Sequence, residues 1–206
     1  MSKFHNIDQN SDEWFYLRSG KFTASSISSL FMGKKTKGYT DTIKKIAIEK
    51  LSNEPVETEF FGTAYTERGH ELEGLAVQEY EKKTFTECTN GGFYELDEWT
   101  GASPDRVIEG FNGGLECKCV GYRKFVDYLH DEKQIEKDYF KQVQAQMYVC
   151  GFDWVDIAVY YPNYKLLTVR VLKDAQFQES IKEEIETAKT AVNKLIEYIK
   201  QFRVEA

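Results

Sequence analysis

The chain has 206 residues, of which 41% are hydrophobic and 15% aromatic, so it can bury a substantial core and lacks the composition of a disordered protein. Its formal net charge of −7 opposes nucleic-acid binding on average, although a local basic surface can outweigh a global acidic excess. The start, MSKFHNIDQNSDEW, lacks the apolar core of a secretory signal, and no apolar run approaches the ~20 residues of a membrane span, so we expect a cytoplasmic protein.

The first quarter of the chain contains signals for three helices. Ser11 in SDEW is typical of a helix cap, a second helix is predicted after Thr23 in TASSISSL, and a third over 40–51. The lysine-rich stretch GKKTKG at 33–38 is predicted to be a loop. It is not a phosphate-binding P-loop, because the spacing GxxxxGK[ST] is absent and no apolar strand precedes it. Its lysines therefore form either a solvated loop or one of the basic patches.

The helix predicted over 65–82 places five apolar residues on one arc, at 100° per residue. These are Leu72, Leu75, Ala76, Val77 and Tyr80. Two acidic residues, Glu73 and Glu79, fall within the same arc. A carboxylate on an apolar face needs a partner, but periodicity alone does not decide which of the two has a special role.

The remaining sequence alternates between strands and helices. Strands are predicted over 85–97, 100–110 and 113–119, with turns at Gly110 and at Gly113-Gly114, and then over 155–161 and 166–172. Helices are predicted over 135–150, where Gln142 and Gln146 form one row, and over about 176–202. This order predicts an α/β (α+β) fold with a central mixed sheet flanked by helices. We expect one domain over 1–206, with its core at about 13–172.

The four cysteines contain no CxxC pair, so neither a zinc site nor an iron–sulfur cluster is expected. Strand side chains alternate between faces, which places Cys117 and Cys119 opposite Glu116 and Lys118. The two cysteines are therefore interpreted as small core residues.

The side chains of Glu116 and Lys118 lie on the same face of the predicted strand. Two interpretations are open: an ion pair on an edge strand, or a site for a metal and a phosphate. Mg²⁺ prefers oxygen ligands and keeps several waters, and Asp105, on a turn-prone Ser-Pro-Asp, can join Glu116 and Glu73 in that role. Lys118 would then orient or deprotonate a water, or offset charge on phosphate.

The motif S-P-D at 103–105, followed by L-E-C-K-C at 115–119, resembles the PD-(D/E)xK nuclease core. More narrowly, the chain resembles the lambda-exonuclease or YqaJ-type viral recombinase family. Three further blocks are similar to that family in order and spacing: EWFYLRSGKFTAS at 13–25, RGHELEGLAVQEYE at 68–81 and YFKQVQAQMYVCG at 139–151. The resemblance covers most of 13–161.

Carried over by position, the resemblance implies a role for each motif residue. The implied metal ligands are Glu73, Asp105, Glu116 and the backbone carbonyl of Cys117. Lys118 becomes the catalytic lysine, and Gln142 assists at the metal centre. The residues implied to hold the 5′-phosphate of DNA are Arg18, Ser25, Ser103 and either Arg123 or Lys124. Without the resemblance, Ser25 would be interpreted as a helix cap and Arg18 as a surface residue.

The resemblance implies a Mg²⁺-dependent 5′→3′ exonuclease acting on the ends of double-stranded DNA in phage-type recombination, with two ions per site and Mn²⁺ able to substitute. Similar enzymes form rings of three subunits around DNA, and a single-strand annealing protein is an expected partner. The alternatives are a RecB-like or restriction-type endonuclease, and a DNA-end-binding protein of the same fold without catalysis.

Overall fold

The structure, a computed structural model, describes residues 1–56 and 64–203, and only the backbone over 64–71. The helices within this part of the chain are α1 Asp12–Arg18, α2 Ala24–Leu30, α3 Lys37–Ser52, α4 Ala64–Thr84, α5 Tyr122–His130, α6 Lys133–Cys150 and α7 Ala175–Lys200. The strands are β1 Lys3–His5, β2 Phe22–Thr23, β3 Cys88–Asn90, β4 Phe93–Asp97, β5 Thr100–Ala102, β6 Arg106–Ile108, β7 Gly113–Cys119, β8 Trp154–Tyr160 and β9 Leu167–Leu172. None of the helices in the described ranges is both long and apolar enough to cross a membrane.

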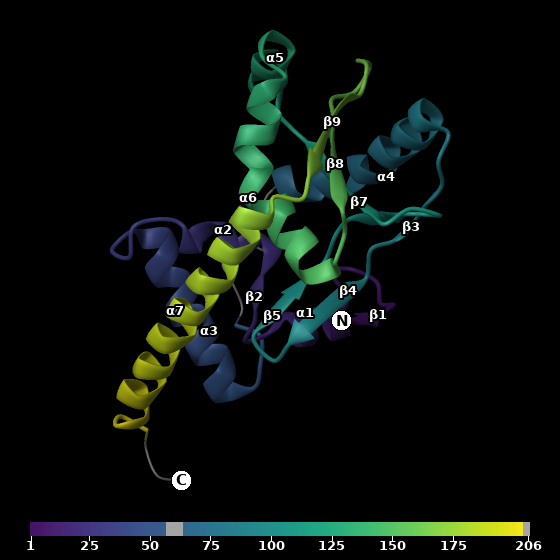
Figure 1. Ribbon diagram of the computed structural model, residues 1–206. Helices are drawn as coiled ribbons and strands as arrows, with labels where there is room; N and C mark the ends of the chain where they lie inside the picture. Colours follow the sequence, from purple (N-terminus) through teal and green to yellow (C-terminus); the bar gives the residue numbers. More distant parts are fainter. Residues whose placement is uncertain (57–63, 204–206) are drawn as a thin grey trace.

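The strands form two mixed sheets beside α6 (Figure 1). The first has the order β1-β4-β5-β2, with β2 and β5 parallel, and the second has the order β3-β6-β7-β8-β9, with β7 and β8 parallel. All other neighbouring strands are antiparallel. The predicted mixed α/β fold is thus confirmed, but the single predicted sheet is wrong.

Two breaks in the predicted strands cause this division. The stretch 85–97 breaks at Gly91-Gly92 and the stretch 100–110 breaks at Ser103-Pro104, so β3 and β6 join one sheet while β4 and β5 join the other. The breaks pack together tightly, since a Cβ atom at Gly91 would lie 1.7 Å from the Pro104 carbonyl oxygen. No larger residue fits at Gly91 without displacing the turn that carries Asp105.

The prediction of a turn at Gly113-Gly114 is also wrong. Both glycines lie within β7, where a Cβ atom would approach the ring of Trp154 to 2.5 Å or that of Phe152 to 2.7 Å. The turn lies just before them and contains Gly110 at φ +78°. These glycines therefore make room for aromatic rings on β7 instead of reversing the chain.

Helix α5 was not predicted. Its apolar residues Tyr122, Phe125, Val126 and Leu129 recur at i, i+3, i+4 and i+7, a clear helical period from which the helix could have been predicted. Phe125 and Tyr128 are buried, whereas Tyr122, Val126 and Leu129 are exposed.

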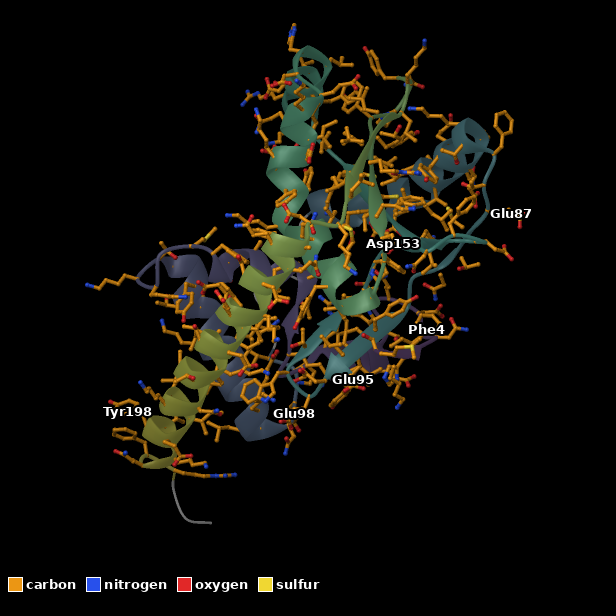
Figure 2. All side chains as sticks on the ribbon, in the orientation of Figure 1. Phe4, Glu87, Glu95, Glu98, Asp153 and Tyr198 are labelled. Carbon is orange, nitrogen blue, oxygen red and sulfur yellow. The ribbon has the colours of Figure 1, made fainter. Side chains whose placement is uncertain are left out.

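Helix α6 is the centre of the packing (Figure 1). It contacts one face of the five-stranded sheet, strands β4 and β5, and helices α2 and α7, while α4 covers the opposite face of that sheet. Side chains fill the space between α6 and the sheet (Figure 2). Alternate residues of β8 serve the two faces: Ile157 packs on the α6 side and Ala158 on the α4 side.

The two amphipathic helices at the edges follow their predicted faces with small differences. On α4, Ala76 and Tyr80 are buried as expected, but Leu75, at the margin of the arc, is 44% exposed. On α7, whose apolar residues recur about every four positions, those from Ile181 to Val192 are buried, and Tyr198, near the end of the helix, is exposed (Figure 2).

Candidate active site

Strand β7 carries the charged pair that the sequence singled out. β7 lies between β6 and β8, and Glu116 is only 3% exposed, so the edge-strand interpretation is wrong. Glu116 and Lys118 lie on the α6 face, whereas Cys117 is buried in the core against α4 and Cys119 packs beside it. The cysteines are core residues, as predicted. Burial, together with the charges of Asp105 and Glu73, raises the pKa of the Cys117 thiol well above its usual value.

Every oxygen of the Glu116 carboxylate accepts a hydrogen bond. Oε1 accepts from Lys118 Nζ and from Gln142 Nε2, each at 2.5 Å. Oε2 accepts from Gln146 Nε2, also at 2.5 Å. The two glutamines are four residues apart on α6 and so reach the same carboxylate from successive turns.

Lys118 is held as a cation. Burial by itself lowers the pKa of an ammonium group, but the charges of Glu116 and Asp105 outweigh it, and the pKa of Lys118 is raised. Its Nζ also lies 5.0 Å from the centre of the Tyr139 ring, a distance at which the ring face attracts a cation. Lys118 is therefore a fixed, protonated donor beside the carboxylates.

Asp105 lies on the turn between β5 and β6, next to Glu116. Its Oδ2 accepts the backbone N–H of Cys117 at 2.7 Å. Burial and then the charges of Glu116 and Glu73 raise the pKa of Asp105 well above its usual value, despite the opposite effects of Lys118 and that hydrogen bond. Carboxylates crowded in this way are costly unless a cation joins them.

The structure separates the two acidic residues that periodicity could not distinguish. Glu79 is exposed and pairs with Lys82 at 2.8 Å. Glu73 is partly buried, and its Oε1 accepts from Arg106 Nη1 at 2.8 Å. The same Nη1 atom donates to the backbone carbonyl of Asp105. Arg106 thus connects Glu73 to the turn that carries Asp105.

The donor set fits a hard divalent cation in its chemistry. Asp105 and Glu116 supply carboxylate oxygens, and a bound cation would relieve the repulsion between these two carboxylates. Mg²⁺ needs only one or two protein carboxylates when waters and phosphate complete its shell. The described residues contain no group of three His, Cys, Asp or Glu side chains arranged to hold a metal. Glu73 is paired with Arg106, and it would have to exchange that partner to become a third ligand.

A second group of residues surrounds Ser103, which is two positions before Asp105 in the sequence. Ser103 Oγ accepts from Trp14 Nε1 and from Arg18 Nη1, both at 2.9 Å. The Arg18 guanidinium also stacks over the Trp14 ring at 4.0 Å from its centre. Burial lowers the pKa of Arg18 to about 10, so the group stays charged at neutral pH. Arg18 and Trp14 line a cleft of about 780 Å³ between α1, α2 and α3.

Ser25 is at the exposed start of α2 and is not hydrogen-bonded to Arg18 or Ser103 within the described residues. Its Oγ lies 3.2 Å from Thr23 Oγ1, and Thr23 lines the same cleft. The capping role belongs to other residues, since the backbone N–H of Thr23 donates to Ser26 Oγ at 2.9 Å.

Arg123 and Lys124 differ in their surroundings although they are neighbours on α5. Lys124 Nζ forms an ion pair with Asp138 Oδ2 at 2.5 Å. Arg123 is exposed and donates to Tyr122 Oη, and the described part of the chain gives it no carboxylate partner. Arg123 therefore has the more available charge.

A family model named YqaJ-like viral recombinase domain matches residues 13–153, well over half of the chain. The chain belongs to this family. A search of curated proteins found no match. The residues Trp14, Arg18, Asp105, Glu116 and Gln142 all lie within the matched range.

Solved structures agree with the family. The chain is similar to the alkaline exonuclease LHK-Exo from Laribacter hongkongensis, with 25% identity and a TM-score of 0.82 over 93% of this chain and 97% of that one. Its complex with dAMP gives 26% identity and a TM-score of 0.81 over the same shares. A phage-related exonuclease from Haemophilus somnus 129PT, at 19% identity and a TM-score of 0.68 over 90% and 99% of the two chains, shares the fold.

Sequence reasoning missed four contacts in this YqaJ-like chain. They are the hydrogen bond of Gln146 to Glu116, the ring of Tyr139 beside Lys118, the stacking of Trp14 on Arg18, and the pairing of Arg106 with Glu73. The first three lie within one helical turn of residues already under consideration, so helical spacing could have found them. The fourth joins α4 to β6 across the fold, and no local pattern contains it.

Proposed function

We propose that this YqaJ-like protein is a Mg²⁺-dependent 5′→3′ exonuclease that degrades one strand of double-stranded DNA from its ends during phage-type recombination. One observation carries the proposal: Ser103, which binds Arg18, and Asp105, which lies beside Glu116, belong to the same short turn. In this proposal, the residues that hold the terminal phosphate and the residues that cleave the phosphodiester meet at that turn. The similarity to an alkaline exonuclease at 25% identity supports this assignment.

The metal-binding part of the proposal assigns Asp105, Glu116 and the carbonyl of Cys117 as ligands, with Glu73 joining after it leaves Arg106. We propose two Mg²⁺ ions, for which Mn²⁺ can substitute. When bound, such ions make a water nucleophilic near neutral pH and offset the charge that develops on phosphate. The charge crowding at Asp105 supports a cation at this place.

The chain's own residues then have distinct roles in cleavage. Lys118, protonated and fixed beside Glu116, donates to a phosphate oxygen and offsets its charge. Gln142 is half-buried, so it can hold Glu116 and still orient a water at the open side of the site. The role proposed for Lys118 does not require it to act as a base.

End recognition is assigned to Arg18, Ser103 and Ser25. A guanidinium binds phosphate through charge-assisted hydrogen bonds, and serine hydroxyls can take the remaining oxygens. The terminal 5′-phosphate would anchor the scissile bond at a fixed distance from the carboxylates. We assign the further phosphate contact to Arg123, because Lys124 is paired with Asp138.

The family resemblance extends the proposal to assembly and partners. A trimeric ring would gather basic residues around DNA and reconcile that binding with a net charge of −7. Exposed apolar residues on α5, namely Tyr122, Val126 and Leu129, offer a surface for subunit contacts. We propose a single-strand annealing protein as partner and the host cytoplasm as location.

Linear and covalently closed circular duplex DNA, incubated with and without Mg²⁺, test the function. We expect loss of linear DNA alone, and only with Mg²⁺. Nicking of circles would instead support the restriction-type or RecB-like endonuclease. A gel shift without cleavage would support the non-catalytic end-binding protein. Strand-specific labels at the 5′ and 3′ ends report polarity in the same reaction.

A further inference from the structure

Gln146 is a fully buried glutamine, 1% exposed, that touches the proposed metal ligand Glu116. Its Nε2 donates to Glu116 Oε2, whereas Gln142 and Lys118 both donate to Oε1. Gln146 is therefore the side chain that holds the second oxygen of this carboxylate. Without it, the described residues leave Oε2 without a donor, and the carboxylate can turn about its last bond.

The contact with Glu116 fixes the orientation of the Gln146 amide. The reverse orientation would place the amide oxygen against a carboxylate oxygen, two acceptors without a proton between them. In the observed orientation, Gln146 Oε1 is buried and finds no hydrogen-bond donor among the described residues. A buried acceptor without a donor destabilises the fold. Gln146 thus donates to Glu116 while its own amide oxygen has no donor among the described residues.

Gln144, two residues earlier on α6, shows what a structural glutamine looks like in the same helix. It is also fully buried, and its amide bonds the carbonyl of Leu172, the N–H of Asp174 and the side chain of Gln178. Both its oxygen and its nitrogen have partners, and none of those partners belongs to the site. Helix α6 therefore contains two buried glutamines that differ in one respect: the Gln144 amide is fully hydrogen-bonded, whereas the Gln146 amide oxygen has no donor among the described residues.

We propose that Gln146 is a positioning residue that fixes the Glu116 carboxylate for binding of a divalent cation. The proposal rests on the proposed function, because it takes Glu116 as a metal ligand. Hydrogen bonds to ligating carboxylates orient them, and loss of such a bond weakens metal binding by about 10- to 100-fold. Gln146 meets this description from the interior, while Gln142 faces the open side.

The test measures Mn²⁺ binding to the metal-free full-length protein by the electron paramagnetic resonance signal of free Mn²⁺. Gln146→Met keeps the volume but removes the hydrogen bond, and we expect the dissociation constant to rise about 10- to 100-fold. We also expect its thermal midpoint to change little, since removal of the unsatisfied Gln146 oxygen offsets the loss of the donor to Glu116 Oε2. The control Gln144→Met should show the reverse, with normal Mn²⁺ binding and a midpoint lowered by about 5 °C or more.

Parallel titrations of the wild type and of Glu116→Gln distinguish a failure of this proposal from a failure of the proposed metal site on which it rests. If the wild type binds no Mn²⁺, or if Glu116→Gln binds it as the wild type does, the metal site itself is wrong and this proposal falls with it. If Glu116→Gln loses binding while Gln146→Met binds as the wild type does, only the role of Gln146 is overturned. If Gln146→Met does not fold, Gln146→Asn, whose shorter side chain withdraws the amide, must show the same weakened binding.

Discussion

Two buried carboxylates lie on adjacent strands of the five-stranded sheet, Glu116 on β7 and Asp156 on β8, and their surroundings differ sharply. Asp156, 5% exposed, accepts hydrogen bonds from Arg170 Nε at 2.8 Å and Nη2 at 2.9 Å, and from the hydroxyl of Tyr80 at 2.6 Å. Arg170 in turn stacks on the Trp154 ring at 3.4 Å from its centre. Each group in this cluster has a complementary partner.

The environment of Glu116 is not balanced in that way. It has three donors, but a second carboxylate, Asp105, lies half-buried beside it with a strongly raised pKa. The Oε1 atom of Gln146 has no donor within the described residues. A fully paired buried charge is what packing alone requires, whereas crowded like charges are typical of functional sites. We infer that the cluster at Asp156 stabilises the sheet and that the cluster at Glu116 is kept for a ligand.

The largest effect should follow from neutralising Glu116. Glu116→Gln should lower single-turnover cleavage about a thousandfold or more, since a metal ligand supplies several kcal/mol of transition-state stabilisation. Its free energy of unfolding should not fall by more than about 1 kcal/mol, because removal of one charge relieves repulsion at Asp105. Cleavage assays and urea unfolding measure both quantities. Near-normal cleavage by the purified variant would overturn the assignment.

Asp156→Ala should have the opposite profile. It leaves Arg170 and Tyr80 without their buried partner and should lower the free energy of unfolding by about 3 kcal/mol. That value is at the low end for a buried pair because the Arg170 side chain is half-exposed. Cleavage per folded molecule should stay normal. The milder Tyr80→Phe should cost about 1 kcal/mol. A specific loss of cleavage in stable Tyr80→Phe protein would mean that this cluster also serves the site.

A smaller effect is expected at the phosphate pocket. Duplexes with 5′-phosphate ends should be degraded faster than those with 5′-hydroxyl ends, and Arg18→Ala should remove most of this preference while Mg²⁺ dependence remains. A charge-assisted contact of about 1.5–3 kcal/mol corresponds to roughly a 10- to 150-fold effect. Lys45→Ala, which removes another positive charge at the same cleft, is the control and should keep the preference for 5′-phosphate ends. Equal digestion of both ends by the wild type, or a full preference in Arg18→Ala, would refute the pocket.

The smallest effect distinguishes Arg123 from Lys124. Arg123→Ala should weaken DNA binding and lower the slope of log affinity against log salt by about 1, as expected for one lost phosphate contact. Lys124→Ala should change the slope less, because its ammonium group is paired with Asp138. Binding is measured in Ca²⁺ over a range of salt concentrations. A larger change for Lys124→Ala would reverse the assignment.

The parts of the site that could be predicted are those governed by local periodicity. Alternation along β7 placed Glu116 and Lys118 on one face and Cys117 on the other. Helical spacing placed Gln142 and Gln146 in one row, and the family resemblance implied that Gln142 lies at the site. Helices α4, α6 and α7 were predicted for the same reason, since one apolar face recurs along each of them, whereas α1 and α2 were predicted from cap signals at Ser11 and Thr23.

The parts that could not be predicted depend on tertiary contacts. Arg106 selects Glu73 over Glu79 by approaching from β6, which the pattern of α4 does not contain. The division into two sheets depends on the close contact between Gly91 and Pro104, which are far apart in sequence. On helix α5 the apolar residues recur with a clear helical period, but only tertiary packing decides that Phe125 is buried while Tyr122, Val126 and Leu129 are exposed.

The most direct test of the comparison between the two clusters is unfolding in the presence and absence of a divalent cation. At a Mg²⁺ concentration about 100-fold above its dissociation constant, the wild type should be stabilised by about 2.7 kcal/mol, a rise of roughly 5–10 °C in the thermal midpoint. Tyr80→Phe, altered in the cluster at Asp156, should show the same rise, whereas Asp105→Asn and Glu116→Gln should show little or none. No rise in the wild type, or an equal rise in Asp105→Asn and Glu116→Gln, would contradict the account.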